Sequence, residues 1–483
     1  MKISLIISVF VILGFGQITW EGEIVDTTIS YSHDFVFNSL ALDTDGIPHI
    51  VYNKSTPTFR SIVYASRDTA GWQKETVDSG LSLIYGLSLT FDADNISHLS
   101  YYKKYNSFDA ETTYMCYALR ETTGWQINNI DTIIGYFGDW YWYIRSSIDL
   151  DTAGLPGIAY TAWNTEDSLH YLKYAHYNGS SWDTSIVTYD STWNGPAPSD
   201  HSQSLQFDSN NRPHIAFGRC HGIWDTLKYA NYSDTTGAWL IEPIYANDKC
   251  AGKVSLVLDS HNYPCIAFDD VALAYTWWDG SSWHLEYVDF LGDMYTKVDL
   301  CIDDFDNPHI IYLQDPFPYR LDARPKYCYK DSIWYLCGPV EPDTSYTTVN
   351  ADISLAIDDY QQAHACYQFS KYDSVQEIIG IKYAKGISTG TMERLKGNES
   401  KQAPRLQVYP NPCRKVLHIK LHTPVENPHI VLFDVSGKKI AAWTLEKDLG
   451  EKSIATNDLP CGIYFVQLKT PNSQEIKKVV LLK

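Results

Sequence analysis

Residues 39–52 read Ser-Leu-Ala-Leu-Asp-Thr-Asp-Gly-Ile-Pro-His-Ile-Val-Tyr, and this stretch decides the fold because its pattern returns seven times. The pattern is Ser-Leu-x-apolar-Asp, four variable residues, and then Pro-His-Ile-x-Tyr or Phe. A signature that recurs along a chain is typical of a repeat architecture, in which each copy is one structural unit. The seven copies begin at Ser39, Ser88, Ser147, Ser204, Ser255, Asp299 and Ser354.

Each repeat contains the pattern of four short antiparallel strands. The signature supplies two of them, separated by its turn, and residues 62–65 and 71–78 supply the second pair in the first copy. Alternating apolar residues bounded by Asp, Gly and Asn turns are typical of such strands. The anchoring aspartates lie 44 to 59 residues apart, a spacing that suits one blade of a β-propeller. The sequence therefore predicts an all-β fold with a seven-bladed propeller over residues 17–386.

The ends of the repeat region indicate how the ring closes. The seventh repeat ends near Gly386 without the Trp-x-x-Glu-x-Val-Asp strand that completes the first one at residues 72–78. The same spacing occurs once before the first repeat, at Trp20, Glu23, Val25 and Asp26. We expect this N-terminal strand to become the outermost strand of the last blade, because pairing the two open edges closes the ring.

The repeated aspartate and histidine are expected to have structural roles. An aspartate at a tight turn caps it through its side-chain oxygen. The segments starting at Asp43 and Asp303 superficially resemble calcium loops, but neither has the Glu that such loops carry at their twelfth position. We expect no metal or cofactor, with calcium as the alternative.

Histidines in five of the seven repeats indicate packing rather than a single site. The position six residues after the aspartate holds His49, His98, Gly157, His214, Cys265, His309 and His364.

Composition limits the compartment and the partners. Lys2 followed by the apolar run of residues 3–16 indicates a signal peptide over residues 1–16. No later segment is apolar enough to predict a membrane span. The chain has a net charge of -20, although residues 405–483 hold 12 Lys and Arg against 7 Asp and Glu. The propeller is therefore acidic, which disfavours nucleic acid as a partner. None of the ten cysteines forms the C-x-x-C pair of a zinc site.

The irregular loops are the predicted place for a ligand. The blade-to-blade segments and the loops between second and third strands share one face, and binding residues concentrate on variable loops of a rigid scaffold. Aromatic rings beside carboxylate and guanidinium groups, as in residues 136–145, suit a sugar. The alternative is that these rings pack the loops onto the propeller. The predicted ligand-binding residues are Trp140, Trp142, Arg145, Trp163, Trp193 and Trp224.

The repeat resembles those of BNR-type propellers of the sialidase superfamily. The Ser-x-Asp-x-Gly-x-x-Trp boxes of propeller sialidases do not occur in it. The resemblance extends to seven-bladed polysaccharide lyases, and it implies His201, Arg219 and His221 as catalytic candidates. In such a lyase reaction, a histidine of this set would act as general base and the arginine would neutralise a uronate carboxylate. No spacing motif supports this set, so the sequence favours binding over catalysis.

The last part of the chain differs from the repeats. Residues 387–404 are polar and predict a linker. Four motifs follow, at residues 406–412, 431–438, 459–466 and 477–483, and their order resembles the type A sorting domain of type IX secretion substrates. The resemblance implies a small β-sandwich over residues 405–483 that the secretion machinery reads. The sorting motif residues are Tyr409, Pro410, Asn411, Pro412, Gly437, Gly462, Tyr464 and Lys483.

Two cysteines of this domain depart from the commoner residues at their positions. Cys413 follows the first motif and Cys461 lies in the third. One hypothesis is that they form a disulfide that joins the first strand to the Leu-Pro-x-Gly-x-Tyr turn.

These features together predict a protein that passes through the periplasm and is secreted or held at the outer cell surface. We expect the propeller to be a binding or adhesion module for an extracellular glycan or protein. The alternatives are a polysaccharide lyase-like enzyme and a structural surface component.

Overall fold

A computed structural model divides the chain into two compact units, Met1–Gly390 and Thr391–Lys483. The described residues contain strands and turns and no helix, so none of them forms a helix that could cross a membrane. The structure describes residues 18–29, 37–56, 59–105, 112–134, 145–164, 166–167, 169–190, 202–219, 225–247, 253–270, 272–289, 297–313, 324–331, 333–346, 352–372, 377–388, 406–409, 413, 415–421, 429–434, 438–444, 451–456, 459–460, 462–469 and 474–481.

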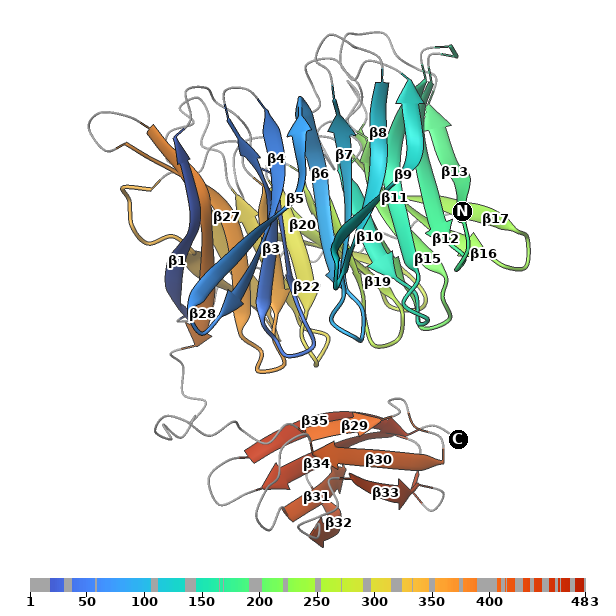
Figure 1. The fold of residues 1–483 in the computed structure, drawn as a ribbon. Coiled ribbons are helices and arrows are strands. Elements are labelled where there is room, and N and C mark those ends of the chain that lie inside the picture. Colours follow the sequence, from blue (N-terminus) through green and yellow to red (C-terminus); the bar gives the residue numbers. More distant parts are fainter. Residues whose placement is uncertain are drawn as a thin grey trace. The chain divides into compact units, whose positions relative to one another are not determined.

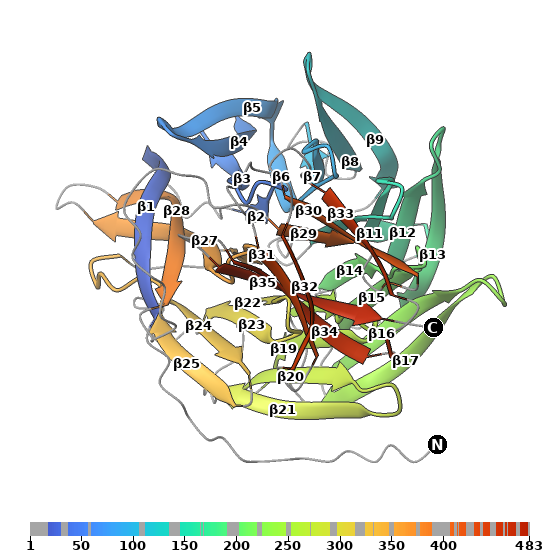
Figure 2. The ribbon, with the colours of Figure 1, turned by 90° about the horizontal axis from the view of Figure 1, so that it is seen from below.

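The first unit is built from seven four-stranded antiparallel sheets arranged in a ring (Figures 1 and 2). Each sheet is one blade, and in the first six blades the strands follow one another in chain order from the innermost to the outermost. Blade 1 comprises β2 (Asn38–Leu42), β3 (Pro48–Ser55), β4 (Arg60–Asp68) and β5 (Gly71–Leu81). Blade 2 comprises β6 (Leu83–Phe91), β7 (Ser97–Lys104), β8 (Thr112–Glu121) and β9 (Gly124–Ile134). Blade 3 comprises β10 (Ser146–Leu150), β11 (Pro156–Asn164), β12 (Leu169–Tyr177) and β13 (Trp182–Asp190).

The other four blades repeat this plan. Blade 4 comprises β14 (Gln203–Phe207), β15 (Pro213–Arg219), β16 (Asp225–Ser233) and β17 (Ala238–Asn247). Blade 5 comprises β18 (Val254–Leu258), β19 (Pro264–Asp269), β20 (Leu273–Trp278) and β21 (Trp283–Asp289). Blade 6 comprises β22 (Lys297–Ile302), β23 (Pro308–Leu313), β24 (Pro325–Lys330) and β25 (Trp334–Pro339). Blade 7 comprises β26 (Ile353–Ile357), β27 (Ala363–Tyr372), β28 (Glu377–Ser388) and β1 (Ile18–Ile29).

Blade 7 confirms that the N-terminal strand closes the ring. β1 pairs antiparallel with β28 along its whole length, with Trp20 opposite Gly386 and Glu23 opposite Tyr383 (Figure 2). Gly386 leaves room for the Trp20 ring, because a Cβ at Gly386 would lie 3.3 Å from it. β28 extends to Ser388, two residues past the predicted end of the propeller at Gly386. The two ends of the propeller are thereby joined in one sheet.

The repeated aspartate caps the turn between the first and second strands, as the sequence predicts. In blade 1, Asp43 Oδ1 accepts hydrogen bonds from the backbone N–H of Asp45 at 3.0 Å and of Ile47 at 2.8 Å. The residue three after the aspartate has a positive φ in every blade, a conformation that Gly and Asn adopt most readily. These residues are Gly46, Asn95, Gly154, Asn211, Asn262, Asp306 and Gln361.

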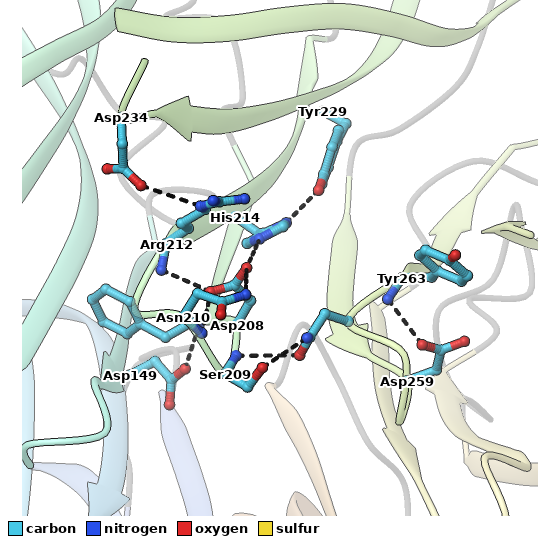
Figure 3. A network of polar contacts seen from close by, with 12 residues as sticks. Asp149, Asp208, Ser209, Asn210, Arg212, His214, Tyr229, Asp234, Asp259 and Tyr263 are labelled. Atoms are coloured by element: carbon cyan, nitrogen blue, oxygen red, sulfur yellow. Dashed lines mark hydrogen bonds and ion pairs between the residues drawn. The ribbon is translucent and has the colours of Figure 1, made fainter. Parts of the chain in front are cut away.

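The repeated histidine lies buried between this aspartate and a tyrosine of the third strand. In blade 7, His364 Nε2 lies 3.1 Å from Asp358 Oδ2 and its Nδ1 lies 2.6 Å from the Tyr383 hydroxyl. Figure 3 shows the same arrangement around His214 in blade 4. Both ring nitrogens of His364 are used inside the fold, which supports a structural role. The other three histidines, with their tyrosines, are His49 with Tyr64, His98 with Tyr117, and His309 with Tyr327.

Burial also favours the neutral form of four of these imidazoles. It lowers the pKa of His364, and the nearby Asp358 carboxylate opposes the shift only in part. Burial acts in the same direction on the pKa of His49, His98 and His214. A neutral imidazole can donate one hydrogen bond, here to the carboxylate, and accept one, here from the tyrosine hydroxyl.

In blade 3 the turn aspartate is also contacted by a histidine, but this histidine comes from a different strand. Gly157 stands where the other blades have a side chain, and the ring of Phe207 from blade 4 occupies the space next to it. His176, on the third strand, places its Nε2 3.1 Å from Asp151 Oδ2 and so replaces the missing imidazole.

Hydrogen bonds between innermost strands link the blades in a closed circle. The signature serine of each blade accepts the backbone N–H of the residue after the equivalent serine in the next blade, and Asp299 does so in blade 6. The last bond, from Leu40 N–H to Ser354 Oγ at 3.0 Å, joins blade 1 to blade 7. We call these seven acceptors the serine ring. The other six bonds are Leu89 to Ser39, Ile148 to Ser88, Leu205 to Ser147, Leu256 to Ser204, Leu300 to Ser255 and Leu355 to Asp299.

A second set of contacts links the blades farther from the axis. Asp26, at the end of the closing motif in β1, accepts a hydrogen bond from Tyr52 at 2.7 Å and pairs with Lys54 at 2.9 Å, both in blade 1. The carboxylate of the outermost strand thus meets a tyrosine and a lysine of the following blade. The equivalent trios are Asp78, Tyr101 and Lys103; Asp131, Tyr160 and Lys173; Asp289, Tyr312 and Lys326; and Glu341, Tyr367 and Lys382.

The C-terminal unit consists of two sheets that share one apolar core, as the predicted β-sandwich requires. The core includes Leu417, Ile430, Val466 and Val479, all buried. One sheet has the order β29 (Leu406–Tyr409), β30 (Val416–Leu421) and β33 (Glu451–Ala455). The other has the order β32 (Lys439–Thr444), β31 (His429–Asp434), β34 (Gly462–Lys469) and β35 (Gln474–Leu481).

The packing at Gly157 predicts that replacing this glycine with the histidine found in most blades would destabilise the propeller. A Cβ at this position would lie 2.6 Å from Phe207 Cζ, so Gly157→Ala should lower the free energy of unfolding by about 1–3 kcal/mol. Gly157→His, which restores the residue of the other blades, should lower it at least as much. Urea titration followed by tryptophan fluorescence measures both changes. Gly22→Ala is the control, because its Cβ meets only ordinary contacts. An unchanged midpoint for Gly157→Ala would contradict this account.

Asp299 generates a prediction on pH dependence. Burial raises the pKa of its carboxyl to about 6, above the usual 3.8. The folded state then binds more protons than the unfolded state between about pH 4 and 6, so stability falls as the pH rises through this window.

The matching variant is Asp299→Ser, which restores the residue found in the other six blades. It should raise the free energy of unfolding at pH 8 by about 1–3 kcal/mol and have little effect at pH 4. Urea titrations at both pH values check this, with the exposed Asp304→Ser as control. A loss of stability at pH 8 would show that the ionised carboxylate stabilises the ring.

Candidate functional site

The candidate site is a cavity of about 140 Å³ between the innermost strands. It lies at the start of these strands, beside the serine ring, and therefore on the irregular face. Serine hydroxyls and the amides of Asn38 and Gln203 provide much of its polar lining. Its charged lining residues are Arg145, Lys253, Lys297, Asp299 and Asp352.

The repeat is broken at this level of the channel. The residues two positions before the serine ring are of six different types in the seven blades, although the ring next to them is nearly uniform. A position that every blade needed for packing would hold similar residues in most copies. The seven residues are Phe37, Gly86, Arg145, Ser202, Lys253, Lys297 and Asp352.

An ion pair crosses the channel inside this cavity. Arg145 starts from blade 3, and its Nη2 contacts Asp352 Oδ1 in blade 7, which is not a neighbouring blade. Lys297 of blade 6 binds the same oxygen with its Nζ at 3.3 Å. The Arg145 guanidinium also lies over the Phe37 ring, 5.2 Å from its centroid. One carboxylate oxygen is therefore shared by two cations.

Positive charge exceeds what this carboxylate balances. The pKa of Lys297 is lowered well below its usual value, mainly by burial and then by the Arg145 charge, with Lys253 adding to the effect and Asp352 opposing it. Arg145 Nη1 is buried and has no hydrogen-bond partner among the described residues. A buried guanidinium nitrogen without an acceptor is costly, so it favours an acceptor from outside.

A buried acidic group lies behind Lys253. Asp269 Oδ1 accepts the backbone N–H of Lys253 at 2.7 Å, and burial raises the pKa of Asp269 to about 7. The neighbouring Asp270 accepts hydrogen bonds from the hydroxyls of Tyr245 and Tyr287 at 3.0 and 3.2 Å. These carboxyl groups are held by the scaffold, which anchors the start of β18.

Two of the predicted ligand-binding residues are described by the structure. Arg145 lies in the cavity, as required for a role in binding. Trp163 is only 7% exposed, and its ring packs against His170 with centroids 4.1 Å apart, so it belongs to the core. The other predicted residues lie outside the described residues or, for Arg219, have only a described backbone in β15. Those outside are Trp140, Trp142, Trp193, Trp224, His201 and His221.

Lys253, Lys297 and Asp352 were missed by reasoning from the sequence. Aligning the seven repeats on their serines could have found them, since the same column holds Arg145. Unusual loop composition does not reveal this repeat position, because its residues stand at the edge of regular strands. No group of three potential metal ligands occurs among the described residues.

In the C-terminal unit, Tyr464 is buried and donates a hydrogen bond to the Pro460 carbonyl at 3.0 Å. Cys413 is a buried free thiol, 3.7 Å from Thr456 Oγ1. Its suggested partner Cys461 lies outside the described residues, and the disulfide stays a prediction. Tyr409 ends β29 and Gly462 begins β34. The remaining sorting motif residues, also outside the described part, are Pro410, Asn411, Pro412, Gly437 and Lys483.

Solved structures similar to this chain are propellers, and these likenesses concern the fold alone. An ulvan lyase of polysaccharide lyase family PL25, bound to -[GlcA(1-4)Rha3S]-, has a TM-score of 0.49 and 12% identity, covering 74% of this chain and 95% of its own. Trypanosoma rangeli sialidase in complex with sialic acid has a TM-score of 0.38 and 8% identity over 85% of each chain. The α-L-arabinanase of Penicillium chrysogenum with arabinobiose has a TM-score of 0.40 and 10% identity, covering 62% of this chain and 92% of its own.

The C-terminal unit has a family assignment. Residues 407–482 match the family described as "Secretion system C-terminal sorting domain". None of the curated proteins matches the chain. The match confirms the resemblance derived from the four motifs, and it implies an interaction with the type IX secretion machinery. Residues 407–482 are therefore a secretion system C-terminal sorting domain, which indicates export by type IX secretion to the cell surface or the extracellular space.

Proposed function

We propose that the propeller is an extracellular binding module that takes part of a glycan into the mouth of its central channel without chemical turnover. The observation that carries this proposal is the break in the repeat two residues before the serine ring. There five blades contribute Arg145, Ser202, Lys253, Lys297 and Asp352 to one cavity, whereas the neighbouring serine ring uses the same residue for structure in nearly every blade. A scaffold that varies at one concave place is typical of a binding site.

The lining of the cavity suits a ligand rich in hydroxyl groups. Ser39, Ser147 and Ser202 each accept one backbone N–H, so their own O–H groups can still be donated to a ligand. Asn38 and Gln203 add amide groups at the same level and are held in place, Asn38 by a 2.8 Å bond to the Asp352 carbonyl and Gln203 by a bond to the Arg145 carbonyl. Such preorganised donors and acceptors hydrogen-bond sugar hydroxyls without loss of side-chain freedom on binding.

Binding is proposed rather than catalysis because the repeated histidines are engaged in structure. Each of the five contacts a tyrosine of the fold, and His364 is held between Asp358 and Tyr383, on the opposite side of the serine ring from the cavity. The lyase hypothesis depends on His201, Arg219 and His221, for which the structure describes no side chain. The sorting domain places the module outside the cell, where polymeric glycans are encountered.

Filling the cavity tests this proposal. Val298 lines it, and Val298→Trp should abolish binding of the chain to its ligands on a glycan array, because the indole takes up most of the volume. Tyr360→Trp is the matched control, since Tyr360 is 56% exposed on the Asp358 turn at the opposite face. Thermal melting verifies that both variants fold. Glycan binding that persists in a folded Val298→Trp would place the ligand elsewhere, and unsaturated products released from a bound polymer would indicate a lyase.

A further inference from the structure

We infer that the group bound in the channel mouth is an oxyanion of an acidic sugar, a carboxylate or a sulfate ester, held by Arg145 and Lys297 with Lys253 beside them. This inference rests on the proposed function and names the ligand class of the same site. Three positively charged residues line the cavity against two carboxylates. One of the two, Asp299, is engaged in the serine ring, where it accepts bonds from Leu355 N–H and the Ser255 hydroxyl.

The first argument is charge balance, compared with the rest of the propeller. Between the blades, Lys103 and Lys173 each have a carboxylate of their own, Asp78 at 3.1 Å and Asp131 at 2.8 Å, and Asp26 is shared only by the more exposed Lys54 and Lys74. In the cavity, Arg145 and Lys297 share the single oxygen Oδ1 of Asp352. Buried charges are stable when they are paired, so the shared carboxylate leaves a place for a second anion.

The second argument is the geometry of Arg145. A guanidinium presents a planar fork whose nitrogens suit the oxygens of a carboxylate or sulfate. One nitrogen, Nη2, contacts Asp352, while Nη1 is buried without a partner among the described residues. The side chain is held in place, because it crosses the channel between two blades and lies over Phe37. The fork is therefore preorganised with one nitrogen unused.

The third argument is that an anion would relieve a cost already present in the site. Burial and the neighbouring Arg145 charge lower the pKa of Lys297, which means that its ammonium form is disfavoured in the free protein. An oxyanion placed between the two side chains would stabilise both charges in a poorly hydrated cavity, where electrostatic attraction is stronger than in water. The chain as a whole has a net charge of -20 and repels polyanions in general, which favours their binding at this positively charged mouth.

The size and lining of the cavity select a sugar as the bearer of the anion. A volume of about 140 Å³ admits one charged group with a few attached atoms. The surrounding hydroxyl and amide groups are suited to the hydroxyls next to that charged group. A terminal or protruding acidic sugar fits these features, and an acidic peptide would leave the serine hydroxyls without equivalent partners.

The experiment is isothermal titration of the full chain with D-glucuronate, D-glucose 6-sulfate, inorganic sulfate and D-glucose at low and high salt, together with a glycan array that contains uronic, sulfated and neutral glycans. Acidic sugars should bind more tightly than D-glucose, and higher salt should weaken them, because screening acts on the charge pair. The uronate and sulfate arms decide between the two oxyanions. Inorganic sulfate that binds as well as every acidic sugar would reduce the site to an adventitious ion only and overturn the inference.

Variants assign the effect to residues. Lys297→Met and Arg145→Gln should each weaken binding of acidic sugars at least tenfold and leave D-glucose unchanged. Lys173→Met, which removes a lysine from the interface of blades 2 and 3, is the matched control and should change neither. Asp352→Asn removes the competing carboxylate and should tighten acidic sugars severalfold, a gain that misfolding cannot produce. Equal binding of acidic sugars by the wild type, Lys297→Met and Arg145→Gln would overturn the inference.

The two proposals fail in distinguishable ways. If only neutral glycans bind and Val298→Trp abolishes their binding, the channel mouth remains the binding site and the oxyanion is wrong. If no glycan and no acidic sugar binds to the folded chain, both proposals are wrong.

Discussion

The circle of hydrogen bonds between innermost strands is the constraint on which the rest of the propeller depends. Each signature serine accepts the backbone N–H of the next blade, and the circle is complete only when Leu40 N–H reaches Ser354. A break at any blade would leave a buried N–H without an acceptor. The pairing of β1 with β28 adds a strand to the last blade from the other end of the chain, so closure joins residues more than 350 positions apart.

The two faces of the closed ring differ in function: the turns between first and second strands stabilise the fold, and the opposite face carries the cavity. On one face, the turn aspartate, the buried histidine and the third-strand tyrosine form one unit that most blades require. Blade 3 shows how strong the requirement is, because it lacks the usual histidine and supplies His176 from another strand for the same aspartate. Residues that satisfy each other in this way are not available to a ligand. On the other face, the residues before the serine ring have no shared structural task, and three cations gather there beside Asp352.

The functional conclusion joins two independent parts of the chain. The sorting domain specifies export and says nothing about the ligand. The propeller provides a rigid ring whose central cavity is polar and rich in positive charge within an acidic protein. The ion pair of Arg145 with Asp352 connects blades that are not neighbours, and it shows that the cavity is part of the fold and also the place where the fold leaves charge uncompensated.

The sequence by itself determined the number of blades, the closing strand, the turn role of the aspartates and the sorting domain. These features are local patterns repeated at a regular spacing, and each copy supports the others. It also identified Arg145, although as part of an aromatic loop. Only the tertiary structure decided that Arg145, Lys253, Lys297 and Asp352 share one cavity, and that Trp163 belongs to the core. These four charged residues come from four blades and are up to 207 positions apart, as Arg145 and Asp352 are. Their meeting follows from closure of the ring, and no local pattern encodes that meeting.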